Sequence, residues 1–85
     1  MHPDDESELV PSHLYRAVVS IVDAGSMTKA GQHLGLSQAA VSQQISRLEE
    51  ILGGPVFDKS GAGLKLTERG EIVLDYARRF LTMNE

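Results

Sequence analysis

The stretch that decides the fold is LGLSQAAVSQQI, which occupies residues 34–45. Gly35 allows the chain to reverse tightly, because glycine adopts the left-handed backbone conformation at little cost. Ser37 can accept a hydrogen bond from a free backbone N–H group, so we expect a helix over about residues 38–52. The buried stripe of this helix recurs at spacings of four, three and four residues and consists of Val41, Ile45, Leu48 and Leu52.

Two helices are expected before this stretch. Ser12 follows a proline and can cap the first helix, which Gly25 ends. Ser26 caps a short second helix over about residues 27–34. Leu36 is expected to fill the space between the second and third helices. Together with the stretch above, this order predicts a helix, a glycine-containing turn and a capped longer helix.

A hairpin and a last helix are expected after it. Two short strands, at 56–57 and 64–66, flank a glycine-rich tip at 60–63. Thr67 then caps a helix that runs to about residue 82. The fold class that this order predicts is mainly α: a winged helix-turn-helix with a three-helix core, a short β-hairpin wing and a C-terminal helix.

The net charge of −4 comes from the N-terminal segment. Residues 1–11 contain four acidic residues and no Lys or Arg, and we expect them to form a disordered acidic tail. The remainder is neutral and divides into a winged helix-turn-helix at 12–66 and a linker or dimerisation helix at 67–85. A neutral domain can still bind nucleic acid if its basic residues cluster on one face.

The helix at 38–52 has an exposed side suited to reading bases. With its apolar stripe turned inward, its first turns present small, uncharged polar groups. Glutamine can pair with adenine through two hydrogen bonds, serine can contact bases or phosphates, and alanine can touch a thymine methyl group. An isolated polar helix is more often plain solvated surface, but the turn and the hairpin favour DNA. The candidate major-groove residues are Gln38, Ala39, Ser42, Gln43 and Ser46. Ser37 caps this helix, whose N-terminus is expected to face a phosphate.

Contacts with phosphate are expected from lysines. Lys59 and Lys65 flank the hairpin tip, and Lys29 lies in the first turn of the second helix. The alternative for each is a solvated surface lysine. Arg47 lies beside the reading side and could equally pair with Glu50, one turn later on the same helix.

The last helix has an apolar stripe that is long for a domain of this size. Ile72 and Val73 are expected to pack in the core. The second half of the stripe is expected to pair two subunits through Tyr76, Ala77, Phe80 and Leu81.

The stretches AGSMTKA (24–30), LGLSQAAVSQQI (34–45) and LTERG (66–70) resemble, as an ordered set, the N-terminal domain of LysR-type transcriptional regulators. The resemblance implies a bacterial, cytoplasmic transcription factor that is not an enzyme and needs no cofactor or metal. It implies sequence-specific binding to double-stranded DNA at an inverted-repeat operator, as a homodimer or a pair of dimers joined by the last helix. In the family, the positions of Gln38, Ala39, Ser42 and Gln43 face the major groove, and that of Lys59 makes the wing contact.

The chain departs from the family pattern in three places. Gly31 stands where a second alanine is usual, which lowers helix propensity. Gln43 stands where arginine is frequent, which suggests a changed base preference. Lys59 replaces a common arginine, so a bidentate contact is not expected there. The larger effector-binding domain of the family is absent, so we expect a truncated piece or a fragment that cannot sense a ligand.

Two other functions fit parts of the sequence. The run HPDDE at residues 2–6 resembles a metal-binding motif of zinc-dependent deacetylases, but no strand precedes it, and His13 and His33 lack ligand-like spacing. A helix-turn-helix that contacts protein, with the last helix as a dimer seam, is the second alternative. The chain has no cysteine and no apolar run long enough for a membrane span, and it lacks a signal peptide pattern, which favours the cytoplasm.

Overall fold

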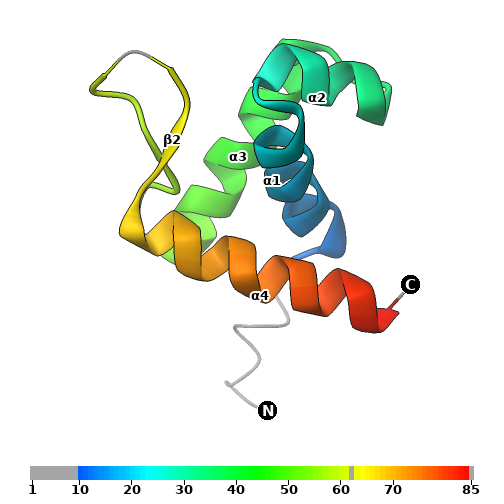
Figure 1. The fold of residues 1–85 in the computed structure, drawn as a ribbon, viewed down its shortest axis with the longest axis vertical. Coiled ribbons are helices and arrows are strands. Elements are labelled where there is room, and N and C mark those ends of the chain that lie inside the picture. The colour runs from blue at the N-terminus through cyan, green and yellow to red at the C-terminus, as the bar shows by residue number, and fades with distance from the viewer. Residues whose placement is uncertain (1–9, 62, 85) are drawn as a thin grey trace.

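The computed structural model describes residues 10–61 and 63–84. Figure 1 shows the first helices of the chain packed together, a hairpin beside them, and the last helix across the opposite end. The elements are α1 (Ser12–Ala24), α2 (Met27–Leu34), α3 (Gln38–Leu52), β1 (Phe57–Asp58), β2 (Lys65–Leu66) and α4 (Glu68–Asn84). The predicted fold class, a mainly α winged helix-turn-helix, is confirmed.

Serine side chains begin α2 and α3 as the sequence predicted. The Ser26 hydroxyl accepts a hydrogen bond from the Lys29 N–H at 3.0 Å, and the Ser37 hydroxyl accepts one from the Ala40 N–H at 3.1 Å. The turn between the two helices contains Gly35 with a φ of 72°, which glycine adopts without strain. These three residues therefore set the helix-turn-helix by local chemistry alone.

The start of α1 differs from the prediction. Pro11, with extended backbone at ψ 146°, is the N-cap residue, and no side chain caps the helix. The Leu14 N–H donates instead to the Pro11 carbonyl at 3.0 Å. Ser12 is already helical, so it does not occupy the extended position from which a hydroxyl caps.

The core forms where α1 contacts the other three helices. Its largest fully buried side chains are Leu14, Val18, Ile21, Val41, Ile45, Leu48 and Val56. Val10 is also buried, so the folded part reaches into the segment that was expected to be a tail. The rest of that segment, residues 1–9, lies outside the described residues.

Gly31 has a packing role that the sequence did not reveal. A Cβ atom there would lie 2.5 Å from the Leu36 carbonyl oxygen, and the Leu36 N–H donates to the Gly31 carbonyl at 2.8 Å. The backbone of the turn therefore rests against α2. The Leu36 side chain is exposed, and the prediction that it fills the space between the helices is wrong, because the turn backbone occupies that space.

The hairpin pairs Phe57 with Leu66 and Asp58 with Lys65, in antiparallel register. Each strand is two residues long, and β1 begins one residue later than predicted. Thr67 caps α4 as expected, because its hydroxyl accepts from the Gly70 N–H at 2.9 Å. The same hydroxyl donates to the Pro55 carbonyl at 2.7 Å, which ties the start of α4 to the chain before β1.

Candidate nucleic-acid interface

The exposed side of α3 matches the expected reading face, which we define as Gln38, Ala39, Ser42, Gln43 and Ser46. All of these side chains are exposed except Ser42, which is half-buried. The opposite side of the helix packs Val41, Ile45 and Leu48 into the core. The reading face therefore lies on a helix that its own packing holds in place.

The N-terminal end of α3 offers a site for an anion. Ser37 is exposed and its hydroxyl oxygen accepts the Ala40 N–H, so the hydroxyl hydrogen remains to donate. Free N–H groups and the positive end of the helix dipole point outward there. Lys29 is exposed in the first turn of α2, which packs against α3.

Lys59 and Lys65 lie on the wing, which we define as residues 56–66, and both are exposed. Figure 1 shows α3 between α2 and the wing, with α2 and the wing rising on the side away from α4. Lys65 lies opposite Asp58 across the hairpin. Hydrogen bonds from Ser60 to this carboxylate, with a smaller effect of Lys65, lower the pKa of Asp58, so the wing combines two lysines with one persistent negative charge.

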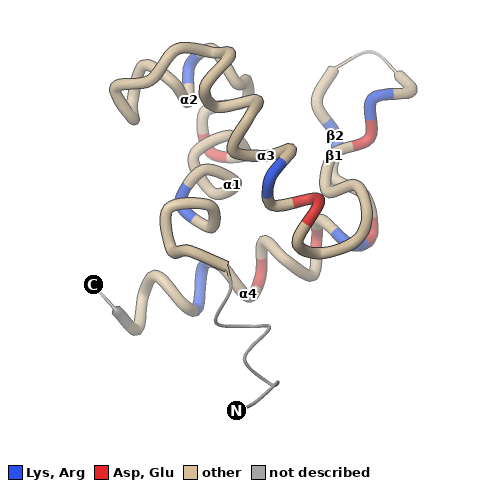
Figure 2. Tube along the Cα trace, turned by 180° about the vertical axis from the view of Figure 1, so that it is seen from behind, with Lys and Arg blue, Asp and Glu red and all other residues tan. Residues whose placement is uncertain are grey.

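Basic residues do not gather on one face. Figure 2 shows blue segments spread over α1, α2, α3, the wing and α4, often with red ones close by. Arg47 is paired with Glu50 at 3.5 Å, and Arg79 with Asp75 at 3.1 Å. No ion pair joins Lys29, Lys59 or Lys65 to another described residue. Those three lysines are therefore the cations best able to exchange water for phosphate.

Glu49 lies near the C-terminal end of α3 and contacts the wing. Its Oε2 accepts from the Val56 N–H at 2.8 Å and from the Phe57 N–H at 3.4 Å. The sequence signal was weak, because an acid late in a helix usually faces solvent. The contact becomes visible only when the chain after α3 folds back over this side chain.

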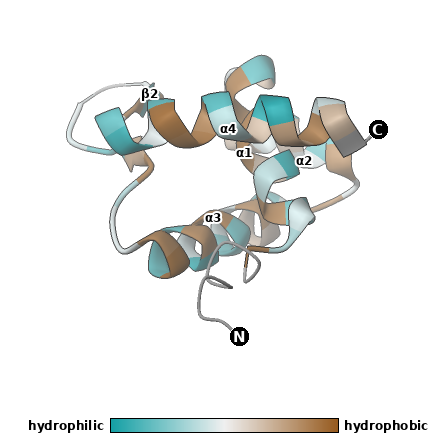
Figure 3. Cartoon of the chain, turned by 90° about the horizontal axis from the view of Figure 1, so that it is seen from below, coloured by the Kyte–Doolittle hydropathy of each residue, from teal (hydrophilic) through white to brown (hydrophobic). Residues whose placement is uncertain are grey.

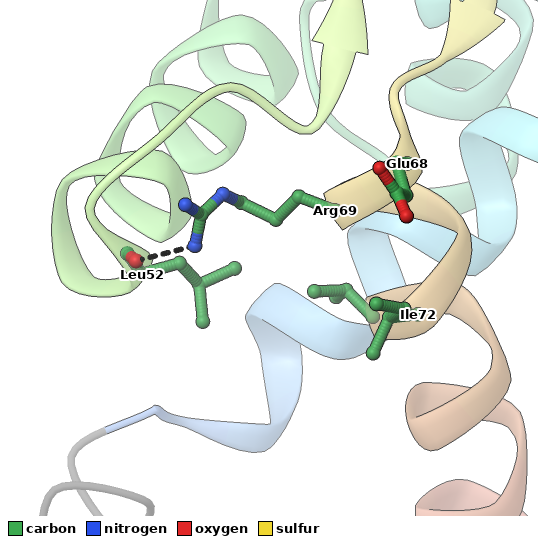
Figure 4. A pocket seen from close by; sticks show the side chains of 5 residues that line it. Leu52, Glu68, Arg69 and Ile72 are labelled. Carbon is green, nitrogen blue, oxygen red and sulfur yellow. Dashed lines mark hydrogen bonds between the residues drawn. The ribbon is translucent and has the colours of Figure 1, made fainter.

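Arginines hold α4 at two points that the sequence did not indicate. Arg69 Nη1 donates to the Leu52 carbonyl at 2.8 Å, as Figure 4 shows beside a hollow of about 460 Å³ at the start of α4. Arg78 and Asp23 form a bridge between α4 and α1 with distances of 2.8 Å and 3.4 Å. That hydrogen-bonded pair lowers the pKa of Asp23 and raises the pKa of Arg78.

The fourth helix carries two apolar stripes, and their roles differ from the prediction. The inner stripe consists of Val73, Ala77 and Leu81, which are 8%, 0% and 9% exposed. Ala77 and Leu81 are therefore buried in the protomer's own packing, and their predicted role in dimerisation stays a prediction. The outer stripe consists of Ile72, Tyr76 and Met83, which are 67%, 44% and 83% exposed. Ile72 was expected in the core and is instead at the surface.

Tyr76 and Phe80 belong neither wholly to the core nor wholly to the exposed surface. Their rings lie 5.4 Å and 5.3 Å from the ring of Tyr15 on α1, in tilted arrangements. Burial and the neighbouring Tyr76 raise the pKa of Tyr15. Figure 3, seen from the α4 side, shows hydrophobic segments alternating with hydrophilic ones along α4. A role for Tyr76 and Phe80 in pairing subunits stays a prediction.

No group of three or more potential metal ligands lies within the described part of the chain. The HPDDE run of residues 2–6 falls outside that part, so its predicted irrelevance stays a prediction. None of the helices described is long and apolar enough to cross a bilayer.

The four helices, the capped turn and the hairpin define a winged helix-turn-helix domain. The family model of the bacterial regulatory helix-turn-helix protein, lysR family, matches residues 12–71, and the chain belongs to that family. It is 44% identical over 75 residues to the small neutral protease regulatory protein of Streptomyces coelicolor, covering 88% of this chain and 23% of that protein. It is 47% identical over 70 residues to a probable RuBisCO transcriptional regulator of Cyanidioschyzon merolae, covering 82% and 23%.

Solved structures with the same fold include two complexes with DNA. The BenM DBD/catB site 1 DNA complex superposes with a TM-score of 0.80 at 32% identity, covering 85% of this chain and 77% of that one. The CbnR DBD–DNA complex also has a TM-score of 0.80, at 30% identity, covering 87% and 85%. The chain therefore covers most of these two DNA-binding domains but spans only 23% of each of the two relatives named above.

Proposed function

We propose that this chain reads double-stranded DNA as the sequence-specific domain of a LysR-type transcription regulator. The observation that carries the proposal is the reading face: a capped helix, fixed by its buried side, that exposes uncharged polar groups between α2 and the wing. Side chains of this kind discriminate bases by hydrogen bonding and methyl contact. The similarity to two domains solved with DNA supports the same conclusion.

In this function the contacts divide between specificity and affinity. Gln38, Ala39, Ser42, Gln43 and Ser46 meet base edges in the major groove. Ser37, Lys29, Lys59 and Lys65 meet phosphates, with the wing on the backbone or in the minor groove. Three lysines are few, so each subunit alone binds DNA weakly, and a second subunit is needed for an operator of ordinary affinity.

The second subunit is proposed to join through α4, where Ile72, Tyr76 and Met83 leave an apolar stripe uncovered. A homodimer with two-fold symmetry reads an inverted repeat, and longer forms of the protein could pair two such dimers. The operator, its genes and any inducer are properties of the whole protein. Its place of action is proposed to be the nucleoid in the bacterial cytoplasm.

Selection of bound sequences from a random DNA pool tests this function directly. We expect an enriched half-site repeated in inverted order, with a spacing set by the dimer. Fluorescence anisotropy on the selected DNA should give a log–log salt slope of about −3 per subunit, from roughly −0.9 for each lysine–phosphate contact. A pool without enrichment, or an affinity for DNA that does not change with salt concentration, would favour the alternative in which the helix-turn-helix contacts protein.

A further inference from the structure

Glu49 links the recognition helix to the wing by both its side chain and its backbone. Its carboxylate accepts the Val56 and Phe57 N–H groups, and its carbonyl accepts the Gly53 and Gly54 N–H groups at 2.8 Å and 3.1 Å. One residue therefore holds the end of α3, the turn after it and the start of β1.

The link matters because the two amides that it holds belong to buried residues. Val56 and Phe57 pack in the core, where a backbone N–H needs an acceptor, and an ionised carboxylate is a strong one. Glu49 itself is half-buried, whereas its neighbour Glu50 is exposed and pairs with Arg47. Adjacent acids on α3 thus have different surroundings, and only Glu49 reaches the wing.

Lys59 follows Phe57 by two residues, and both border the same hollow. Glu49, Lys59 and Thr67 line the same hollow, of about 340 Å³. The two-residue strand β1 pairs with an equally short β2, so the hairpin ladder by itself fixes the direction of the wing poorly. The carboxylate contact from α3 supplies a second constraint on where Lys59 lies.

We infer that Glu49 is a positioning residue: it locks the wing to the recognition helix, so that Lys59 reaches a phosphate while the reading face is in the major groove. This inference rests on the proposed DNA contact of the wing. The alternative that the test must exclude is that the negative charge of Glu49 near Lys59 weakens binding to DNA. The two roles predict effects of opposite sign.

Two substitutions of Glu49 in the full chain separate the effect of its side-chain length from the effect of its charge. Glu49→Gln keeps an oxygen acceptor at the same reach and removes the charge, whereas Glu49→Asp keeps the charge and shortens the side chain by one methylene. The same substitutions at Glu50 are the controls, because they make the same changes of length and charge on the same helix without touching the wing. Glu50→Gln also removes the pairing with Arg47, whereas Glu50→Asp keeps both charges of that pair. Each variant is measured on the selected DNA over a range of salt, after thermal unfolding shows that it is folded.

For a positioning role we expect Glu49→Asp to bind about tenfold more weakly, with a salt slope shallower by roughly 0.9 as one phosphate contact is lost. Glu49→Gln should lose at most about threefold, and the Glu50 variants should keep the wild-type slope. Adding Lys59→Ala to the Glu49→Asp variant should weaken binding to DNA by less than about twofold more, because Lys59 no longer reaches the phosphate in that variant.

Tighter binding by Glu49→Gln, or a full independent effect of Lys59→Ala in the Glu49→Asp background, would overturn the inference. If Glu49→Asp does not fold, the sign of the Glu49→Gln effect still decides between the two roles. Failure of the wild-type chain to bind any DNA would instead reject the proposed function, so the two failures are distinguishable.

Discussion

Helices α3 and α4 are similar in length but differ in how their apolar residues are used. In α3 a single stripe is buried, and the exposed side is polar apart from one alanine. In α4 an inner stripe packs against α1. An outer stripe lies about 100° further around the helix and is exposed among the described residues, although the Tyr76 ring also contacts Tyr15. The single stripe of α3 is buried by α1 and α2, whereas the exposed second stripe of α4 is the basis for the proposed second subunit.

This difference explains why the sequence wrongly placed Ile72 in the core. Both stripes of α4 fit a period of 3.6 residues, so periodicity identifies both stripes but does not tell which one is buried. The direction from which α1 approaches makes Ala77 core and leaves Ile72 outside. In α3 there is a single apolar stripe, so the sequence itself indicates the buried side.

The largest expected effect is on an inner-stripe residue. Ala77→Glu places a charge where the side chain is completely buried, and we expect it to lower the free energy of unfolding by at least about 3 kcal/mol. Urea unfolding followed by circular dichroism measures this. A variant that stays as stable as wild type but no longer self-associates would return Ala77 to the interface and remove the distinction between the stripes.

A matching change on the outer stripe should act on assembly instead. Ile72→Glu leaves the free energy of unfolding within about 0.5 kcal/mol, because the residue is exposed. We expect it to abolish self-association and to weaken binding to the inverted repeat about 100-fold, while binding to one half-site is unchanged. Sedimentation velocity and anisotropy measure the two effects. Thr82→Glu, an exposed position off the stripe, is the control; equal effects would show that charge alone was responsible.

On α3 the expected effect is on base preference. Gln43→Ala should weaken binding to the selected DNA by about 1–3 kcal/mol and relax the preference at one base pair, with random DNA bound as before. Competition assays with single-base variants of the half-site measure this. Gln32→Ala on α2 is the matched control. An equal loss on selected and random DNA would mean that Gln43 does not read a base.

The smallest effect should come from the bridge that joins α4 to α1. Asp23→Asn removes an exposed ion pair with Arg78, and we expect a loss of about 0–1 kcal/mol in unfolding free energy at neutral pH. Because folding lowers the pKa of Asp23, the contribution is complete above its ordinary value of 3.8 and is lost as the pH falls through the lower folded-state pKa.

Unfolding of the wild type and the Asp23→Asn variant at several pH values measures the contribution of this ion pair to the free energy of unfolding. The two stability curves should converge in acid. Curves that stay separated below the folded-state pKa would show that Asp23 stabilises the chain by something other than its charge.

Much of the helix-turn-helix followed from residues that act on their own neighbours. Ser26, Ser37, Gly35 and Thr67 cap or turn the chain through bonds that span a few residues, and each was placed correctly. The reading face followed as well, since one buried stripe fixes what is exposed. Ser12 failed as a cap because the preceding proline took the extended position.

The sequence by itself therefore determined the order of elements, the family and the exposed side of α3, because these depend on local hydrogen bonds and on one helical period. Tertiary structure alone decided the contact of Glu49 with the wing, the two arginine anchors of α4, the close approach at Gly31 and the roles of the two α4 stripes. Each of these brings together residues whose meeting depends on the angle at which separate elements cross. No local pattern records that angle.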